Sequence, residues 1–290
     1  MKSLGLALGG GGLKGLAHIG VLEIMQENNI PINMICGTSA GSIVAALYAS
    51  GMPVHKMEKI AASLKPSDYI DYNILGIVKY LTGLCLPNYQ AKLDGIIKGD
   101  SLEELVYQWT DGKSLNDVSM PLSIIAVDID SGQEVVFTNQ EFELEGRHVK
   151  IVRDALLSEA VRASISIPAT FVPLNFEGMQ MIDGGVRSIV PVTAAKAMGA
   201  QYILAVNLGQ ETYDTKVAGM IQIISRSLNI LTYETSDTAE EIFADLIIFP
   251  RVGEVHLDDM DKAEQIIRAG RRAAKEHIAE IKNGLQTLSK

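Results

Sequence analysis

The chain has 290 residues, of which 47% are hydrophobic and 21% charged, and it carries a formal net charge of −10 at pH 7. This composition is typical of a globular chain long enough to bury a sizeable core, and the negative charge excludes nucleic acid as a bulk electrostatic partner. It also disfavours unaided adsorption to anionic lipid, although a local basic face could still bind there.

Cysteine and histidine usage gives no sign of a disulfide framework or a metal site. Cys36 and Cys85 are the only cysteines, each in an apolar context, and the five histidines are scattered without ligand-like spacing. We therefore expect a reducing compartment, no metal and no cofactor.

Two apolar stretches could be mistaken for targeting or membrane-spanning segments. The first 22 residues break on glycines and Lys14 and show no convincing cleavage site, so we expect no signal peptide. Residues 28–54 carry no charge, but Pro31, Asn33 and a GTSAG cluster interrupt the run, which favours strand, turn and helix over a membrane span. We expect a cytoplasmic protein, with peripheral contact to a membrane left open.

Short apolar runs alternate with helical patterns along the chain, which indicates a mostly parallel sheet covered by helices on both faces. The expected strands lie at residues 3–8, 32–36, 122–129, 133–138, 179–183, 202–208 and 245–249. The expected helices lie at residues 13–29, 42–50, 54–64, 101–109, 150–160, 191–198, 215–234 and 260–284.

Residues 66–99 break this alternation. Tyrosines, leucines and isoleucines are interspersed there with glycine and proline, and no clean period emerges. One interpretation is a flexible apolar lid or a membrane-touching segment, and the other is an irregular helical insertion packed on the core. We favour the insertion.

A glycine run, LALGGGGLKG at residues 6–15, joins the first strand to the first helix. Gly10, Gly12 and Gly15 fit a G-x-G-x-x-G dinucleotide fingerprint, but the strand at 32–36 lacks the acidic residue that would hold a ribose. A P-loop needs serine or threonine after its lysine, whereas Lys14 is followed by glycine and leucine. Neither nucleotide interpretation is well supported.

The second strand leads into CGTSAG, where Ser39 stands between Gly37 and Gly41 as G-x-S-x-G. A strand before this motif and a helix after it form the context of a nucleophile elbow. The glycines leave room for a sharp turn, and the helix points its amino-terminal dipole end at the serine. We interpret Ser39 as a nucleophile rather than as part of a plain glycine-rich turn.

A serine nucleophile needs a base. His148 is flanked by charges, and His256 and His277 resemble surface residues, so each is a weak candidate. Asp183 closes an apolar strand before two glycines, which leaves room for its carboxylate to face another loop. The same position suits a turn aspartate equally well, and the residues alone leave both interpretations open.

Attack by serine on an ester creates an oxyanion that needs hydrogen-bond donors. The backbone amides of Gly10, Gly11 and Gly12 begin a helix beside the first strand, and we expect this strand to neighbour the second. Losing one such donor typically costs about 3 kcal/mol of transition-state stabilisation. We therefore expect these three glycines to form an oxyanion hole.

The order of these motifs resembles that of the patatin-like phospholipase family. The family's G-G-G-x-[R/K]-G, G-x-S-x-G and D-G-G boxes match residues 10–15, 37–41 and 183–185, and the segments 161–173 and 127–137 also look similar. The resemblance covers roughly residues 4–208, and residues 209–290 look like a C-terminal extension, strand plus helices, packed on the same domain. One departure is Ile189, which stands where family members often carry asparagine.

The resemblance implies a three-layer α/β/α patatin-like fold and a serine lipid acyl hydrolase without histidine or calcium. Ser39 would attack a phospholipid or lysophospholipid ester, Asp183 would take its proton, and an acyl-enzyme would form before water releases the fatty acid. The alternatives are an acyl thioesterase or general carboxylesterase, and a non-catalytic lipid-binding regulatory protein.

Overall fold

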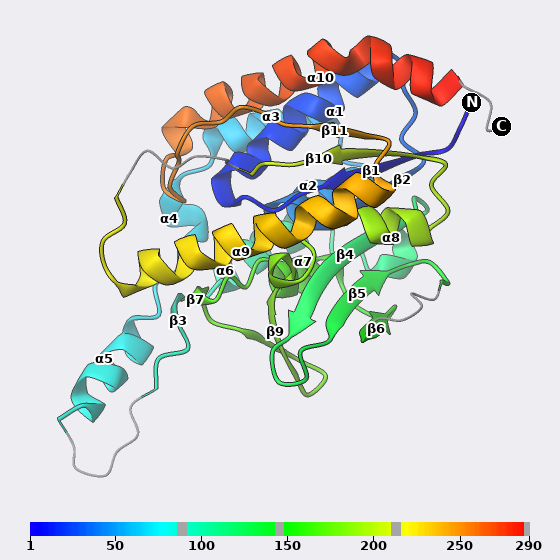
Figure 1. Ribbon diagram of the computed structural model, residues 1–290. Helices are drawn as coiled ribbons and strands as arrows, with labels where there is room; N and C mark the ends of the chain where they lie inside the picture. The colour runs from blue at the N-terminus through cyan, green and yellow to red at the C-terminus, as the bar shows by residue number, and fades with distance from the viewer. Residues whose placement is uncertain (86–91, 143–147, 210–215, 287–290) are drawn as a thin grey trace.

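The computed structural model describes residues 1–85, 92–142, 148–209 and 216–286. Residues 86–91 of the irregular segment, and residue 215 at the start of one expected helix, lie outside these ranges. Figure 1 shows the arrangement of the described elements.

A mostly parallel sheet forms the centre of the molecule, as the sequence predicted. The five strands at one side of it, β11, β10, β1, β2 and β4, pair in parallel in that order. Next to β4 come β5, antiparallel, and then β6; β9 also pairs antiparallel with β4, and β8 pairs with β9. The bounds of these strands are β1 (Leu4–Leu8), β2 (Met34–Thr38), β4 (Leu122–Asp128), β5 (Glu134–Thr138), β6 (Val149–Val152), β8 (Leu174–Phe176), β9 (Met179–Asp183), β10 (Tyr202–Val206) and β11 (Leu246–Ile248).

Helices lie on both faces of this sheet, and a separate parallel pair joins β3 (Gly95–Ile97) to β7 (Ala169–Phe171). The helices are α1 (Ala17–Glu27), α2 (Ala40–Ala49), α3 (Val54–Ser63), α4 (Pro66–Tyr69), α5 (Ile74–Gly83), α6 (Asp100–Trp109), α7 (Leu157–Ser164), α8 (Val192–Ala197), α9 (Met220–Phe243) and α10 (Ala263–Gln286). Short 3-10 turns are η1 (Gly12–Leu16), η2 (Leu115–Asp117), η3 (Gly184–Val186) and η4 (Met260–Lys262).

Strand β1 shows how the layers form. Because successive side chains of a strand point to opposite faces, Leu4, Leu6 and Leu8 pack with apolar residues of α1, α2, α3, α7 and α10. Ala7 faces the other way, into the cluster that contains residues of α8 and α9. The sheet is thus buried on both sides, which confirms the expected α/β/α arrangement.

Two expectations about secondary structure are wrong. The expected helix at 150–160 is instead β6 followed by α7, because Val149–Val152 pair in parallel with β5. Helix α7 begins only where Glu159 accepts a hydrogen bond from the Leu156 amide, 2.8 Å away. Helix α9 also ends at Phe243, nine residues beyond the expected end at 234.

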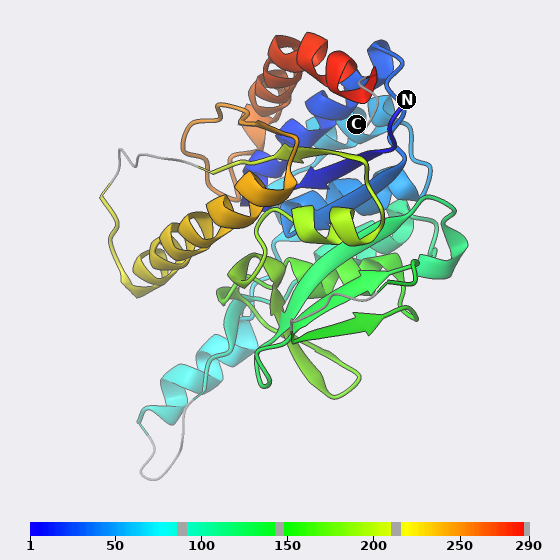
Figure 2. The same cartoon turned by 45° about the vertical axis from the view of Figure 1, so that its right-hand side comes forward.

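Helix α5 corrects the expectation for residues 66–99. Its apolar side chains are exposed instead of packed on the core, and the helix projects away from the body in both views (Figures 1 and 2). Among the described residues, no helix is both long and apolar enough to cross a bilayer.

In the tail after residue 209, β11 and α10 are closely packed on the rest of the molecule. β11 extends the sheet beside β10, and α10 crosses α1 so tightly that a side chain at Gly270 would lie 1.8 Å from the Ala17 carbonyl oxygen. Arg271 of α10 also forms ion pairs with Glu23 and Glu58. The tail therefore shares the core of residues 4–208.

Candidate active site

Ser39 lies on a sharp turn between β2 and α2. Its φ of 52° and ψ of −126° are unfavourable for a residue with a side chain, so the surrounding structure must hold them in place. A side chain at Gly37 would lie 2.4 Å from the Gly41 carbonyl oxygen, and one at Gly41 would lie 2.2 Å from the Leu8 carbonyl oxygen. Both glycines are therefore required by close backbone contacts, as a nucleophile elbow demands.

Asp183 lies beside this turn at the end of β9. Its backbone pairs with Ala126 of β4, and its amide donates to the Ser166 carbonyl oxygen at 2.9 Å. Its Oδ1 accepts the Gly185 amide at 2.7 Å, and the Ser39 side chain is near enough to lower the pKa of the carboxylate. The structure thus brings together the two residues that the sequence singled out.

Burial dominates the electrostatics of this pair. Only 4% of Ser39 and 5% of Asp183 are exposed. Desolvation raises the pKa of Asp183 to about 6, against the opposing effects of the Ser39 side chain and the Gly185 amide. The carboxylate is therefore more basic than an ordinary aspartate, yet still ionised at pH 7.

Two further hydroxyl groups hold the turn, and no sequence pattern indicated their role. Ser164 accepts the Ser39 amide at 2.8 Å and donates to the Ile125 carbonyl oxygen at 2.6 Å. Thr38 donates to the Ser188 carbonyl oxygen at 2.9 Å. Because Ser188 follows Asp183 closely, these contacts fix the elbow relative to both β4 and the aspartate loop.

The glycine run lies against the serine, but its three amides are not equivalent. A side chain at Gly10 would lie 3.1 Å from Ser39 Cβ. The Gly10 amide, however, donates to the Ile189 carbonyl oxygen at 2.9 Å, so in this structure it is already engaged, and its role in an oxyanion hole stays a prediction. Among the described residues, the Gly11 and Gly12 amides meet no acceptor.

His18 lies behind the glycine run and was not singled out by its sequence context. It is fully buried, and its Nε2 is 2.8 Å from the Gly9 carbonyl oxygen, while Nδ1 has no partner among the described residues. Desolvation lowers the pKa of His18 to about 4, so the ring is neutral at pH 7 and donates from Nε2. His18 thus holds the peptide that precedes Gly10.

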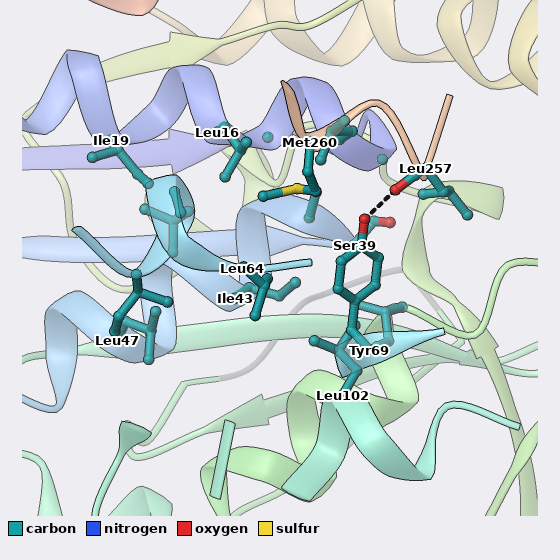
Figure 3. A pocket seen from close by; sticks show the side chains of 18 of the residues that line it. Leu16, Ile19, Ser39, Ile43, Leu47, Leu64, Tyr69, Leu102, Leu257 and Met260 are labelled. Carbon is teal, nitrogen blue, oxygen red and sulfur yellow. Dashed lines mark hydrogen bonds between the residues drawn. The ribbon is translucent and has the colours of Figure 1, made fainter. Parts of the chain in front are cut away.

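A cavity of about 140 Å³ opens beside Ser39 (Figure 3). Its described lining contains no charged side chain and comes mainly from η1, α2, α3, α4 and α6. Tyr69 of α4 donates a hydrogen bond to the Leu257 carbonyl oxygen near the serine, and so joins two walls of the cavity. The cavity suits a hydrocarbon chain.

The three histidines considered as bases from the sequence, His148, His256 and His277, do not line the cavity. In the described ranges, no group of three or more acidic, histidine or cysteine side chains is arranged to hold a metal ion.

An elbow serine, a buried carboxylate and an adjoining apolar cavity are features typical of serine acyl hydrolases. The family model described as "Patatin-like phospholipase" matches residues 6–196. The chain therefore belongs to the patatin-like phospholipase family, which confirms the family expected from the motifs and supports lipid acyl hydrolase activity.

Named relatives agree with this membership. The chain is 26% identical over 257 residues to "Lysophospholipase NTE1" of Pyricularia oryzae, covering 84% of this chain and 15% of that protein. It is 24% identical over 226 residues to "Patatin-like phospholipase domain-containing protein 6" of Homo sapiens, covering 75% of this chain and 14% of that protein. It thus spans only a small part of these relatives.

A solved structure shares the fold. VipD from Legionella pneumophila superposes with a TM-score of 0.51 at 14% identity, covering 96% of this chain and 67% of that one. At this identity the likeness concerns the fold alone.

Proposed function

We propose that the chain hydrolyses fatty-acyl esters of phospholipids or lysophospholipids, with Ser39 as nucleophile and Asp183 as general base. The observation that carries this proposal is the buried Asp183 carboxylate, which the Ser39 side chain influences directly, next to an apolar cavity. The named lysophospholipases among the relatives support the choice of lipid substrate.

The chemistry runs in two halves. Asp183 accepts the hydroxyl proton as Ser39 Oγ bonds to the carbonyl carbon, and the Gly11 and Gly12 amides donate to the resulting oxyanion. The carbonyl re-forms, the C–O bond to the alcohol breaks, and Asp183 returns the proton to that alcohol. Water then attacks the acyl-enzyme, gives its proton to Asp183, and Ser39 leaves with that proton as the fatty acid departs.

Burial makes Asp183 a stronger general base than an aspartate in water. A carboxylate in water has a pKa near 3.9 and is a poor base for serine. With the pKa of Asp183 raised to about 6 by desolvation, the base is stronger and still unprotonated at pH 7.

The pH dependence follows from this pKa. Asp183 works only when ionised, so kcat/KM for a short-chain ester is expected to be constant above pH 7 and to fall about tenfold per unit below pH 6. Ester turnover between pH 4.5 and 8.5 measures this, with circular dichroism at each pH to show that the fold persists. Constant activity down to pH 5 would contradict a buried aspartate as base.

The choice of substrate is tested by direct competition. Purified protein is given palmitoyl-lysophosphatidylcholine, palmitoyl-coenzyme A and a short-chain ester, and released fatty acid is measured by mass spectrometry. We expect kcat/KM for the lysophospholipid to exceed that for the thioester by at least about tenfold, which is 1.4 kcal/mol of transition-state binding. The reverse order would favour a thioesterase, and no turnover of any ester would contradict the enzyme.

A further inference from the structure

Helix α5 presents a continuous apolar surface to solvent. Ile74 is 67% exposed, Leu75 63%, Val78 49% and Leu81 57%. Contiguous exposed apolar residues of this kind mark interaction sites, unlike apolar residues scattered singly. The helix stands clear of the body in both views (Figures 1 and 2). Such a helix has surface area available for a partner.

The amino-terminal half of α9 adds a second apolar stripe. Ile223 and Ile224 are exposed, as are Ile230 and Leu231 seven residues later. Seven residues are two helical turns, so these four side chains share one face. In both views this end of α9, drawn in yellow, projects from the same side of the molecule as α5.

The charges on these two segments differ from those of the whole chain. Residues 74–85 contain one charged residue, Lys79, and residues 216–231 contain only Lys216 and Arg226. Arg226 pairs with Glu254 at 3.1 Å. Within a chain of net charge −10, the exposed apolar segments themselves carry only basic side chains. In a symmetric dimer these side chains would face their own copies, whereas an anionic lipid surface attracts them.

The base of α5 is tied to the candidate active site. Tyr69 and Ile70, just before α5, line the cavity. β3, the next described element of the chain after α5, pairs with β7, whose Phe171 lines the cavity too. Buried Arg162 of α7 donates to the Lys98 carbonyl oxygen and, at 2.7 Å, to the Val172 carbonyl oxygen. The segments on either side of α5 therefore connect the helix to the cavity wall.

We propose that α5 and the amino-terminal half of α9 form a docking surface for a bilayer that contains anionic phospholipid, with the apolar stripes in the interfacial region and the lysines at the head groups. The inference rests on the proposed function, because it names the membrane partner of the same site. Interfacial helices bind in this way, through buried apolar area together with electrostatic attraction.

Vesicle binding tests the docking surface. Full-length protein is sedimented with ether-linked phosphatidylcholine vesicles, with and without about 30% ether-linked phosphatidylglycerol, so that no ester can be hydrolysed. The variant is Val78→Glu, and the matched control is Ile129→Glu, since Val78 and Ile129 are both 49% exposed and Ile129 lies in the turn after β4.

We expect wild type to bind the anionic vesicles at least about fivefold more tightly than the neutral ones. Val78→Glu is expected to weaken binding at least about fivefold, while Ile129→Glu changes it less than about twofold. Equal binding by Val78→Glu and wild type, or no binding by wild type, would overturn the inference. So would a wild-type dimer that Val78→Glu dissociates without altering lipid binding, as measured by light scattering.

Failure of the docking surface is distinguishable from failure of the proposed function. Ser39→Ala is expected to bind vesicles like wild type, because docking does not use the nucleophile. Vesicle binding without any ester turnover would leave the docking surface standing and remove the hydrolase. Ester turnover without vesicle binding would leave the hydrolase standing and remove the docking surface.

Discussion

Replacing Ser39 by alanine is expected to reduce hydrolysis of palmitoyl-lysophosphatidylcholine by at least about 10⁴-fold, because no other group can form the acyl-enzyme. Alanine at this position is no more strained than serine, so the elbow should persist. The measurement is fatty-acid release by the two proteins at equal concentration and matched circular dichroism.

The control for this variant is Ser63→Ala. Ser63 is exposed and its hydroxyl donates to the Ile60 carbonyl oxygen within α3, at 3.1 Å. We expect its activity to stay within about twofold of wild type. Hydrolysis by Ser39→Ala at more than a tenth of the wild-type rate would show that another residue carries the reaction.

Replacing Asp183 by asparagine is expected to lower activity and raise stability together. Asparagine can still accept the Gly185 amide and can donate to Ser39, but it cannot accept the serine proton, so we expect kcat to fall about 10³-fold or more. The same change removes a carboxylate that burial makes costly to ionise.

The sign of the stability effect follows from the pKa. In the folded chain the pKa of Asp183 lies at about 6, above the ordinary 3.8, so the folded state binds the proton more tightly than the unfolded state does. Ionisation of Asp183 therefore does not lower the free energy of unfolding below pH 3.8. Its destabilising effect grows as the pH rises through 6. At pH 8 the ionised Asp183 lowers the free energy of unfolding by about 3 kcal/mol, which is the pKa shift converted at about 1.4 kcal/mol per unit.

Chemical denaturation at pH 4 and pH 8 measures this effect. We expect Asp183→Asn to be more stable than wild type at pH 8, and the two to be nearly equal at pH 4. A variant that is less stable than wild type at pH 8 would mean that the hydrogen bonds of the carboxylate outweigh its desolvation.

Local patterns explain which parts of the site were predictable. Ser39 and its two glycines stand within five residues between a strand and a helix, so one short stretch of the sequence contains the whole elbow motif. Asp183 closes a buried strand before two glycines, which indicates a constrained turn but not what the carboxylate faces. Only the fold brings it to Ser39.

The site contacts that the sequence did not predict join segments that lie far apart in the chain. The Gly10 amide is taken by the Ile189 carbonyl oxygen, and no pattern near either residue predicts this bond. His18 occupies an ordinary apolar position of α1, and its contact with Gly9 depends on how the helix folds back over the loop. Ser164 binds the Ser39 amide from α7.

The same limit applies to the fold. The main parallel strands were predictable because each is a buried apolar run. β7 and β8 have three residues each and include polar ones, so neither shows the apolar run that marked β11, which is equally short. The sequence of α5 contains enough leucine, isoleucine and valine for a core helix, and nothing local indicates that these side chains face solvent.

The central claim, that Asp183 activates Ser39, is tested most directly by the rate at which a fluorophosphonate labels the protein. The probe reacts with activated serines, and peptide mass spectrometry identifies the modified residue. We predict labelling at Ser39, slowing about tenfold per pH unit below pH 6 in wild type and reduced at least about 10³-fold at every pH above 7 in Asp183→Asn. Labelling of another serine, or equal rates in wild type and Asp183→Asn at pH 7.5, would contradict the account.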